Sequence, residues 1–351
     1  MNKFISSLEV LKKAITGNFL AKPECWFQRA GFLVSCLSTP GGEFQTYLKK
    51  TIAQFTLRTN IVKMVASIDN AIERAAKAIE DSGALVITAG AGIGVDSGLP
   101  DFRGNEGFWK AYPPIAKLGI SFSEMANPSW FKSDPGLAWA FYGHRLNLYR
   151  KTTPHKGFDQ LLEMAQEKQS QYFIFTSNVD GQFQKAGFSD ARIEECHGSI
   201  HHFQCTENCS DDIWGAKNTN IRIDEGAFKA LEPLPVCTSC GALARPNILM
   251  FSDWEWIPQR SLNQAEHLDT WLANLQSQNT TIAIIELGAG SSIPTVRRRS
   301  EQLATRTRAQ LIRINPRDYQ VPQSHISVPL AASEGIDRIY RKIKENRSAS
   351  R

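Results

Sequence analysis

The stretch ALVITAGAGIGVDSGLPDFRG, residues 84–104, joins a short apolar run to a glycine-rich loop. The apolar run does not alternate with polar residues, which is typical of a parallel strand covered on both faces. Glycines directly after such a strand let the backbone approach a phosphate group closely. The common dinucleotide fingerprint is absent, because Val95 stands where its third glycine would be, and no Gly-Lys-Ser/Thr triplet follows. The loop is therefore either a dinucleotide site of another kind or a set of turns.

Three further apolar runs resemble the first, at residues 172–178, 282–290 and 310–316. Segments with the pattern of a helix, such as residues 156–168, separate some of them. This alternation predicts an α/β fold, with an open parallel Rossmann-like sheet and helices on both faces. The carboxyl ends of parallel strands form one ligand crevice, where amides at a following helix start can also hold phosphate. The runs end in small or polar residues, and these are the candidates for the crevice: Gly90, Gly92, Ser177, Asn178, Gly288, Gly290 and Asn315.

The cysteines indicate a metal site inserted between the strands. Four of the seven cysteines form two close pairs: Cys205, Cys209, Cys237 and Cys240. Two such pairs can present four thiolates tetrahedrally to one zinc ion, and a filled tetrahedron leaves no position for water, so the zinc would be structural. Four reduced thiols without metal are the alternative, and His201 and His202 lie near enough in sequence to compete as ligands. We expect a small zinc-ribbon module at about residues 196–244.

His197 precedes this module in the segment EECHGSIHHFQC. A histidine at the junction of two parts of a fold faces a cleft, where a neutral imidazole can take a proton from a sugar hydroxyl. The competing interpretation is a structural histidine with no part in chemistry.

Composition and charge favour no nucleic acid or membrane partner. The chain has 351 residues, 21% of them charged, and a net charge of +5 without a dense stripe of Lys and Arg. Its longest apolar runs are far too short to span a bilayer. Residues 1–63 differ from the rest, since their first 60 residues hold eight Lys or Arg and three Asp or Glu. We expect an irregular N-terminal extension there, with Met64 as a possible true start and an organelle transit peptide as the alternative, and we expect a cytoplasmic protein.

Several of these motifs, in this order, resemble the sirtuins, the NAD-dependent protein deacylases, over about residues 66–340. The resemblance is to bacterial-type members of the family. It implies NAD as cofactor, one structural zinc, an acylated protein or peptide as partner, and nicotinamide and O-acyl-ADP-ribose as products. The cofactor contacts that it implies are Gly90, Ala91, Gly92, Ile93, Asp101, Phe102, Arg103, Ser177, Asn178, Asp180, Gly288, Ala289, Gly290, Ser291 and Asn315.

The resemblance also assigns catalytic roles. Asn178 and Asp180 would line the nicotinamide pocket, and His197 would be the general base that accepts a proton from a ribose hydroxyl. The segment RPNILMF would bind the substrate peptide as an extended chain, with Ile248, Leu249 and Phe251 as contacts.

The chain departs from the family pattern at three places. Ser177 stands where the family usually has Gln, Ser252-Asp253 stand for the usual Gly-Glu, and Ala289-Gly290 stand for the usual Thr-Ser. These changes put acyl and protein specificity in doubt more than the use of NAD.

Tyr142 and Arg145 lie three residues apart and share a face if their segment is helical. The desuccinylase and demalonylase branch of the sirtuins has a Tyr-x-x-Arg pair in its acyl pocket, where the Arg can grip an acyl carboxylate. A surface Arg beside a half-buried Tyr is the other interpretation of this short pattern.

Three functions remain in play at this stage: a deacylase, an NAD hydrolase or ADP-ribosyltransferase on the same fold, and an NAD-sensing module without catalysis. We favour the deacylase, because an NAD hydrolase needs neither a zinc ribbon nor a peptide-binding segment, and because the complete set of His197, Asn178 and Asp180 argues against a module without catalysis. The expected organisation is an extension at 1–63, a catalytic domain at 64–345 with its NAD-binding part at about 64–195 and 245–345, and a tail at 346–351.

Overall fold

The computed structural model describes residues 64–100, 104–169 and 171–349. The predicted extension at 1–63 and three predicted cofactor contacts, Asp101, Phe102 and Arg103, lie outside the described residues. From Ala66 onward the chain forms one compact unit. Its division into an NAD-binding part and a zinc module at the residues given above stays a prediction.

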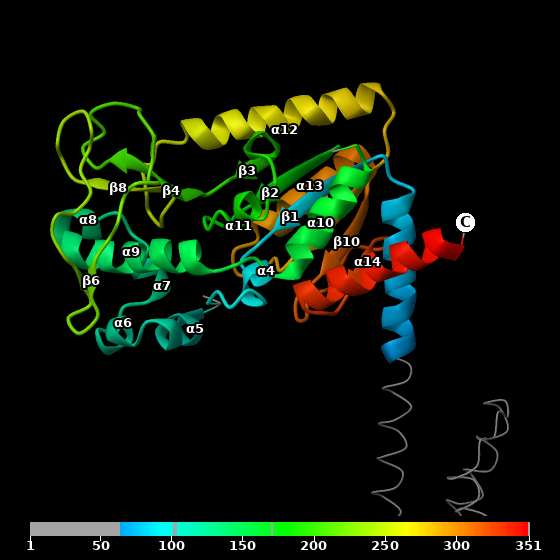
Figure 1. Ribbon diagram of the computed structural model, residues 1–351, viewed down its shortest axis with the longest axis horizontal. Helices are drawn as coiled ribbons and strands as arrows, with labels where there is room; N and C mark the ends of the chain where they lie inside the picture. Colours follow the sequence, from blue (N-terminus) through cyan, green and yellow to red (C-terminus); the bar gives the residue numbers. More distant parts are fainter. Residues whose placement is uncertain (1–63, 101–103, 170, 350–351) are drawn as a thin grey trace, which may run out of the picture. The chain divides into compact units, whose positions relative to one another are not determined.

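A parallel sheet of six strands forms the centre of this unit, in the order β11-β10-β9-β1-β2-β3 (Figure 1). Its strands are β1 (Ala84–Ala89), β2 (Tyr172–Thr176), β3 (Ile193–Glu195), β9 (Ile282–Leu287), β10 (Gln310–Ile314) and β11 (Ile326–Val328). The four apolar runs of the sequence are β1, β2, β9 and β10, so those strand predictions are confirmed. We did not predict β3 and β11, because strands of three residues are too short to show a pattern.

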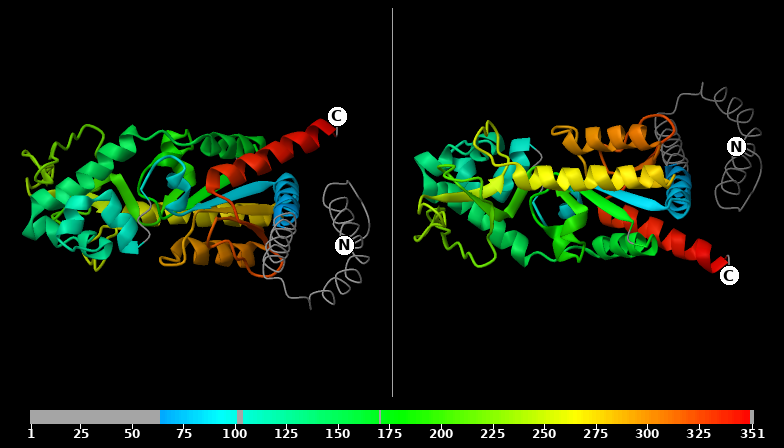
Figure 2. Two further views of the ribbon diagram at one scale, coloured as in Figure 1. Left: turned by 90° about the horizontal axis from the view of Figure 1, so that it is seen from below. Right: turned by 90° about the horizontal axis from the view of Figure 1, so that it is seen from above.

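Helices cover both faces of this sheet, as Figure 2 shows. They are α10 (Lys156–Glu167) and α14 (Ala332–Ala349) on one face, and α12 (Gln259–Ser277) and α13 (Thr295–Thr307) on the other. On α10, Phe158, Leu161 and Ala165 follow one another at helical spacing and are buried against the sheet. All six residues of β1 and of β9 are buried, which explains why neither strand alternates. The predicted fold class is confirmed.

The direction in which strands are added reverses between β1 and β9. From β1 the chain adds β2 and β3 on one side, and it then returns to add β9, β10 and β11 on the other. Such a switch point opens a crevice at the carboxyl ends of the two strands, where ligands of open α/β sheets bind.

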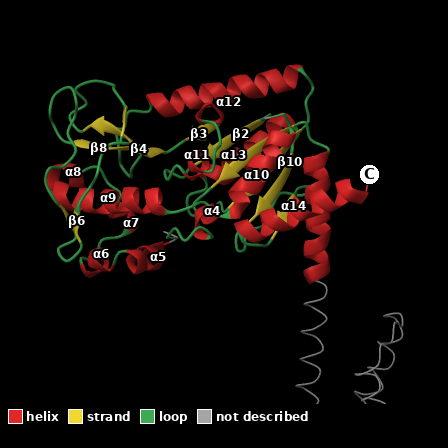
Figure 3. Cartoon of the chain, viewed as in Figure 1, coloured by secondary structure: helices red, strands yellow, loops and turns green. Residues whose placement is uncertain are grey.

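Beyond that edge of the sheet, short helices and small sheets form a second core, seen at the left of Figure 3. The helices after β1 are α4 (Gly92–Val95), α5 (Gly104–Ala111), α6 (Pro113–Lys117), α7 (Phe122–Met125), α8 (Trp130–Ser133) and α9 (Pro135–Lys151). The shorter elements after β2 are α11 (Gln182–Lys185), the 3-10 helix η1 (Asp190–Arg192), β4 (Gly198–Cys205), β5 (Trp214–Gly215), β6 (Ile223–Asp224), β7 (Lys229–Ala230) and β8 (Ala244–Ile248). Antiparallel pairs join β4 to β5 and to β8, and β6 to β7. Helix α9 is apolar around most of its circumference because this second core surrounds it.

The C-terminal helix α14 continues to Ala349, past residue 345 where we expected the catalytic domain to end. No helix among the described residues combines the length and the apolar character that crossing a membrane requires.

The loops after β1 and β9 pack backbone against backbone at the switch point. Gly288 has a φ of +57°, and a Cβ there would lie 2.4 Å from the carbonyl carbon of Gly92 and from the amide nitrogen of Ile93. A Cβ on Gly90 would lie 2.9 Å from the carbonyl oxygen of Gly288. Only glycine permits this approach, so both sequences are constrained by the contact between them.

We expect Gly288→Ala to lower the free energy of unfolding by about 2 kcal/mol or more, since it combines a left-handed φ with a backbone clash. Urea unfolding of the full chain measures this value. Gly290→Ala is the matched control two residues away, because a Cβ at Gly290 meets no atom within 4 Å. Equal stability of the two variants would contradict the packing described here.

Candidate active site

A cavity of about 580 Å³ lies at the carboxyl ends of β1, β2 and β9. Helix α9, the start of β4 and the end of β8 complete its wall, so segments far apart in the sequence meet there. Its size falls within the range of small-molecule sites. The cavity lies at the switch point of the sheet, at the strand ends where we predict the ligand crevice from the sequence.

The cavity brings together most of the predicted site residues. Those that line it are Gly90, Ala91, Tyr142, Arg145, Ser177, Asn178, Asp180, His197, Ile248, Leu249, Phe251, Gly288, Ala289, Gly290 and Ser291. Three other predicted contacts, Gly92, Ile93 and Asn315, are not among its lining residues.

These three residues support the cavity wall through hydrogen bonds to its backbone. The amide of Gly92 donates to the carbonyl oxygen of Gly288 at 3.0 Å. The amide of Ile93 donates to the carbonyl oxygen of Gly90 at 3.2 Å. These first amides of α4, which we expected to be available to a phosphate, are thus engaged within the protein. Asn315 is fully buried, and its side-chain amide donates to the carbonyl oxygen of Ala289 at 2.9 Å, which holds the loop after β9 in place.

Asn178 is fixed where β2 ends. Its backbone amide donates to the hydroxyl of Thr176 at 3.0 Å, and its Nδ2 donates to the carbonyl oxygen of Gly90 at 3.2 Å. The second contact joins the strand ends of β1 and β2. It also leaves the side-chain oxygen of Asn178 as the group available to a ligand amide in the cavity.

Asp180 is one of two acidic residues that line the cavity. Burial raises the pKa of Asp180 to about 6, although the amide of Gln182 donates to its Oδ1 at 3.0 Å and favours the charged form. The carbonyl oxygen of Asp180 lies 3.0 Å from Nε2 of His201, so His201 serves the backbone of this loop. Because its ring is engaged at this loop, His201 does not join the four cysteines as a possible metal ligand.

His197 stands at the start of β4 and lines the cavity. Its backbone is held firmly, because its carbonyl oxygen accepts from the amide of Leu249 at 3.0 Å. The next residue, Gly198, has a φ of +76°, and a Cβ there would lie 2.1 Å from the carbonyl oxygen of Asn247. Burial lowers the pKa of His197 below its usual value, so the imidazole is neutral at pH 7 and can accept a proton.

The segment after β8 is held by a buried ion pair. Arg245 binds Asp253, and neither side chain is appreciably exposed. Asp253 also accepts from the amides of Met250 and Glu255, and the amide of Phe251 donates to the carbonyl oxygen of Ala126. Asp253 therefore keeps an acid at the position where the sirtuin pattern has Glu, and this acid shapes the loop.

Tyr142 and Arg145 share the face of α9 that lines the cavity. Both are buried, at 1% and 7% exposure, and the hydroxyl of Tyr142 has no hydrogen-bond partner in the described part of the chain. The guanidinium of Arg145 donates from Nε and Nη2 to the hydroxyl of Tyr149, at 3.1 and 3.0 Å, and lies over the ring of Phe141. These contacts hold a positive charge at the wall of a largely apolar pocket.

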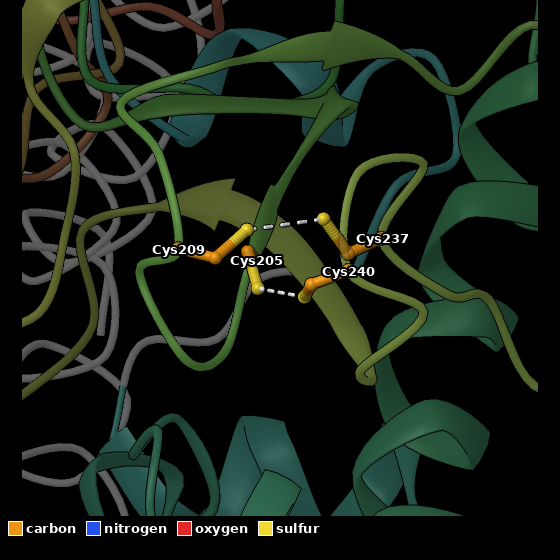
Figure 4. Close-up of side chains that lie close together, drawn as sticks. All are labelled: Cys205, Cys209, Cys237 and Cys240. Atoms are coloured by element: carbon orange, nitrogen blue, oxygen red, sulfur yellow. Dashed lines mark hydrogen bonds between the residues drawn. The ribbon is translucent and has the colours of Figure 1, made fainter.

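The four cysteines converge at the end of the second core, where their sulfurs point toward one another (Figure 4). All four sulfurs lie within 4.8 Å of one another, and two pairs are 3.6 Å apart. Zinc–sulfur bonds of about 2.3 Å in a tetrahedron place the sulfurs about 3.8 Å apart, so the donor set fits a structural zinc. The amides of Glu207 and Ser239 donate to two of the sulfurs, Cys205 and Cys237, which stabilises thiolates.

Several lining residues carry no motif and were missed from the sequence. Tyr149 lies four residues after Arg145 on the same helix face, a spacing that could have identified it. Asp318, whose Oδ1 lies 3.3 Å from the hydroxyl of Ser291, follows Asn315 closely in the sequence. Phe122 and Ile293 gave no local signal, because only the fold brings them to the cavity, whereas Met250 lies within the predicted peptide-binding segment.

The sequence of the chain is similar to that of one protein family and of several named relatives. Residues 90–279 match the Sir2 family. An NAD-dependent protein deacylase of Aquifex aeolicus is 28% identical over 262 residues, which are 74% of this chain and 95% of that protein. An NAD-dependent protein deacylase of Thermococcus kodakarensis is 33% identical over 196 residues, 54% of this chain and 67% of that protein.

Solved structures give the same picture. A Sir2 homologue in complex with NAD is 26% identical and has a TM-score of 0.56, with 78% of this chain and 94% of that chain covered. A mutant Sir2 homologue in complex with ADP-ribose is 25% identical and has a TM-score of 0.57, with 78% of this chain and 97% of that chain covered.

We expect the purified protein to hold one zinc ion per chain by elemental analysis, and Cys237→Ser to lose it. Hydrogen exchange should then rise by about tenfold or more in β4, β5 and β8, since the metal ties their ends together. Exchange in β1 and β9 should stay the same, because the parallel sheet has its own core. Metal-free protein with unchanged exchange in the three strands would contradict a structural zinc.

Proposed function

This chain belongs to the Sir2 family, the sirtuins, and we propose that its cavity carries out NAD-dependent removal of acyl groups from lysine side chains of proteins. One observation carries the proposal. The strand-end glycines, the Asn178–Asp180 loop, His197 and the segment after β8 all line one cavity. A site that binds a nucleotide and an extended peptide side by side, with a general base in its wall, can transfer an acyl group from the peptide to the nucleotide.

The described residues fit NAD in this cavity. Gly90, Gly288 and Gly290 present backbone without side chains, which suits a pyrophosphate. The side-chain oxygen of Asn178 and the carboxyl of Asp180 suit a nicotinamide amide. Bound NAD would supply the ADP-ribose that receives the acyl group as nicotinamide leaves.

The protein's own part in the chemistry is to orient its ligands, exclude water and move one proton. We propose that His197 accepts a proton from a ribose hydroxyl and so makes that hydroxyl a nucleophile toward the acyl carbon. Its neutral imidazole supports this role. Leu99, Val179 and Ile248 surround the cavity with apolar surface, which keeps water from competing with the hydroxyl.

The substrate peptide would lie along the segment after β8. The amides of Leu249, Met250 and Phe251 already donate within the protein, to His197, Asp253 and Ala126 respectively. A substrate backbone would therefore donate to carbonyl oxygens of this segment and find few donors in return. This arrangement leaves the cavity for the acyl-lysine side chain.

We further propose that the enzyme accepts acidic acyl groups such as succinyl and malonyl. Arg145 offers a buried positive charge, and Tyr142 offers a buried hydroxyl that has no hydrogen-bond partner among the described residues, both on the wall of the acyl pocket. A carboxylate that bound both would satisfy the hydroxyl and gain a charge-assisted hydrogen bond.

The proposal includes an acylated protein or peptide as the only macromolecular partner, and neither nucleic acid nor membrane. It also places the protein in the cytoplasm, a proposal that the clustered thiols support, since such a site requires a reducing compartment.

We expect His197→Ala to lower turnover of an acyl-lysine peptide by about 10³-fold while NAD affinity stays within about twofold, because the base acts only in catalysis. Nicotinamide release, measured with and without peptide, gives the turnover. In the wild type, kcat/KM should hold from pH 8 to 6.5 and fall below that, as the lowered pKa of His197 requires. Unchanged turnover in the variant would remove the base assignment, and rapid nicotinamide release without peptide would favour an NAD hydrolase.

We expect Arg145→Met to lower kcat/KM for a succinyl-lysine peptide by about 100-fold, since it removes the charged partner of the acyl carboxylate. The fall for the acetyl-lysine peptide should be far smaller. Tyr142→Phe is the matched variant. It removes a buried hydroxyl to which no described residue bonds, and it should leave the unfolding temperature unchanged or slightly raised. A strong preference for acetyl in the wild type that survives Arg145→Met would contradict acidic acyl recognition.

A further inference from the structure

Trp254 is the feature that the proposed chemistry leaves unexplained. It is 95% exposed, more than any other large apolar side chain in the described ranges. An indole that stays in water forgoes the stabilisation that its burial would give. A single exposed apolar residue is ordinary on a protein surface. The surroundings of this one are not.

The loop that carries Trp254 is held in place on both sides. Asp253 is bound by Arg245 and by two backbone amides. Glu255 pairs with Lys132 at 2.9 Å, and its carbonyl oxygen accepts from the side-chain amide of Gln204 at 2.8 Å. The backbone around Trp254 is therefore held by the contacts of its two neighbours, and the indole extends from it into solvent.

Trp254 follows shortly in the chain after two apolar residues that line the cavity. Leu249 and Phe251 line the cavity and are still 38% and 40% exposed, so they reach its mouth. Phe251 packs edge-on against Phe122, another lining residue, with ring centroids 5.9 Å apart. A turn at residues 251–252 follows, and Trp254 comes three residues after Phe251 in the chain.

We propose that Trp254 is a docking contact for an apolar side chain of the protein substrate, a few residues from the acyl-lysine. This inference rests on the proposed deacylase function and adds the chemistry of the flanking sequence. The carboxylates beside Trp254 are already paired, Asp253 with Arg245 and Glu255 with Lys132, so the site offers no net charge to select a charged flank. An indole presented from a held backbone provides a large apolar contact area, as aromatic anchors of protein interfaces do.

Two sets of acyl-lysine peptides test the inference, one with alanine on both sides of the lysine and one with leucine or phenylalanine placed in turn at each flanking position. The wild type should prefer at least one apolar-flanked peptide by about tenfold in kcat/KM. Trp254→Ala should abolish this preference and change turnover of the alanine-flanked peptide less than about twofold. Trp254→Phe should keep most of the preference, and Leu231→Ala, at another exposed apolar residue outside the cavity, should keep all of it.

Equal loss on both peptides in Trp254→Ala, or an unchanged preference, would overturn the inference. So would a preference for lysine or arginine flanks, or a change of oligomeric state as the main effect of the substitution, which would indicate contact with a second copy of the chain. Peptide affinity by fluorescence anisotropy is read in parallel and does not depend on turnover. If no peptide supports nicotinamide release, the deacylase proposal fails by itself, and the anisotropy still decides whether Trp254 binds apolar flanks.

Discussion

The site depends on one close approach, that of the loop after β9 to the loop after β1. Gly288 and Gly92 meet backbone to backbone, and the amide of Gly92 donates to the carbonyl oxygen of Gly288. This contact brings together two strands that are neighbours in the sheet and nearly two hundred residues apart in the chain. Because the direction in which strands are added reverses between β1 and β9, the loops diverge beyond the contact and leave a cavity. The glycines therefore close the floor of the site, while their neighbours form its walls.

The second element on which the site depends is β4. It begins beside His197 and ends at Cys205, so one strand connects the proposed base to the cysteine cluster. Its partner β8 leads into the segment that would bind the peptide, and the buried pair of Arg245 and Asp253 fixes that segment. Breaking such a pair leaves a buried charge, which is costly, so the loop has little freedom to change shape. The cysteine cluster, the base and the peptide segment are thus parts of one framework.

Much of this arrangement could be predicted from the sequence, for reasons visible in particular elements. The strands β1, β2, β9 and β10 are almost entirely buried, so each appears in the sequence as a mostly apolar run that ends in glycine or a polar residue. The spacing of the four cysteines predicted the cluster of sulfurs that fits a zinc ion. The sequence could not give the hydrogen bonds that occupy the first amides of α4, because they depend on where the loop after β9 lies. For the same reason the sequence could not show that the side chain of Asn315 is buried and supports the neighbouring loop, while its contact with the cofactor stays a prediction.

The most direct test of the account is a crystal structure of the protein with ADP-ribose and an acyl-lysine peptide. The account predicts the pyrophosphate against Gly90 and the Gly288–Gly290 loop, the peptide along the segment after β8, and a ring nitrogen of His197 within about 3 Å of a ribose hydroxyl. A dinucleotide bound elsewhere on the sheet, or a His197 ring turned away from the sugar, would contradict it.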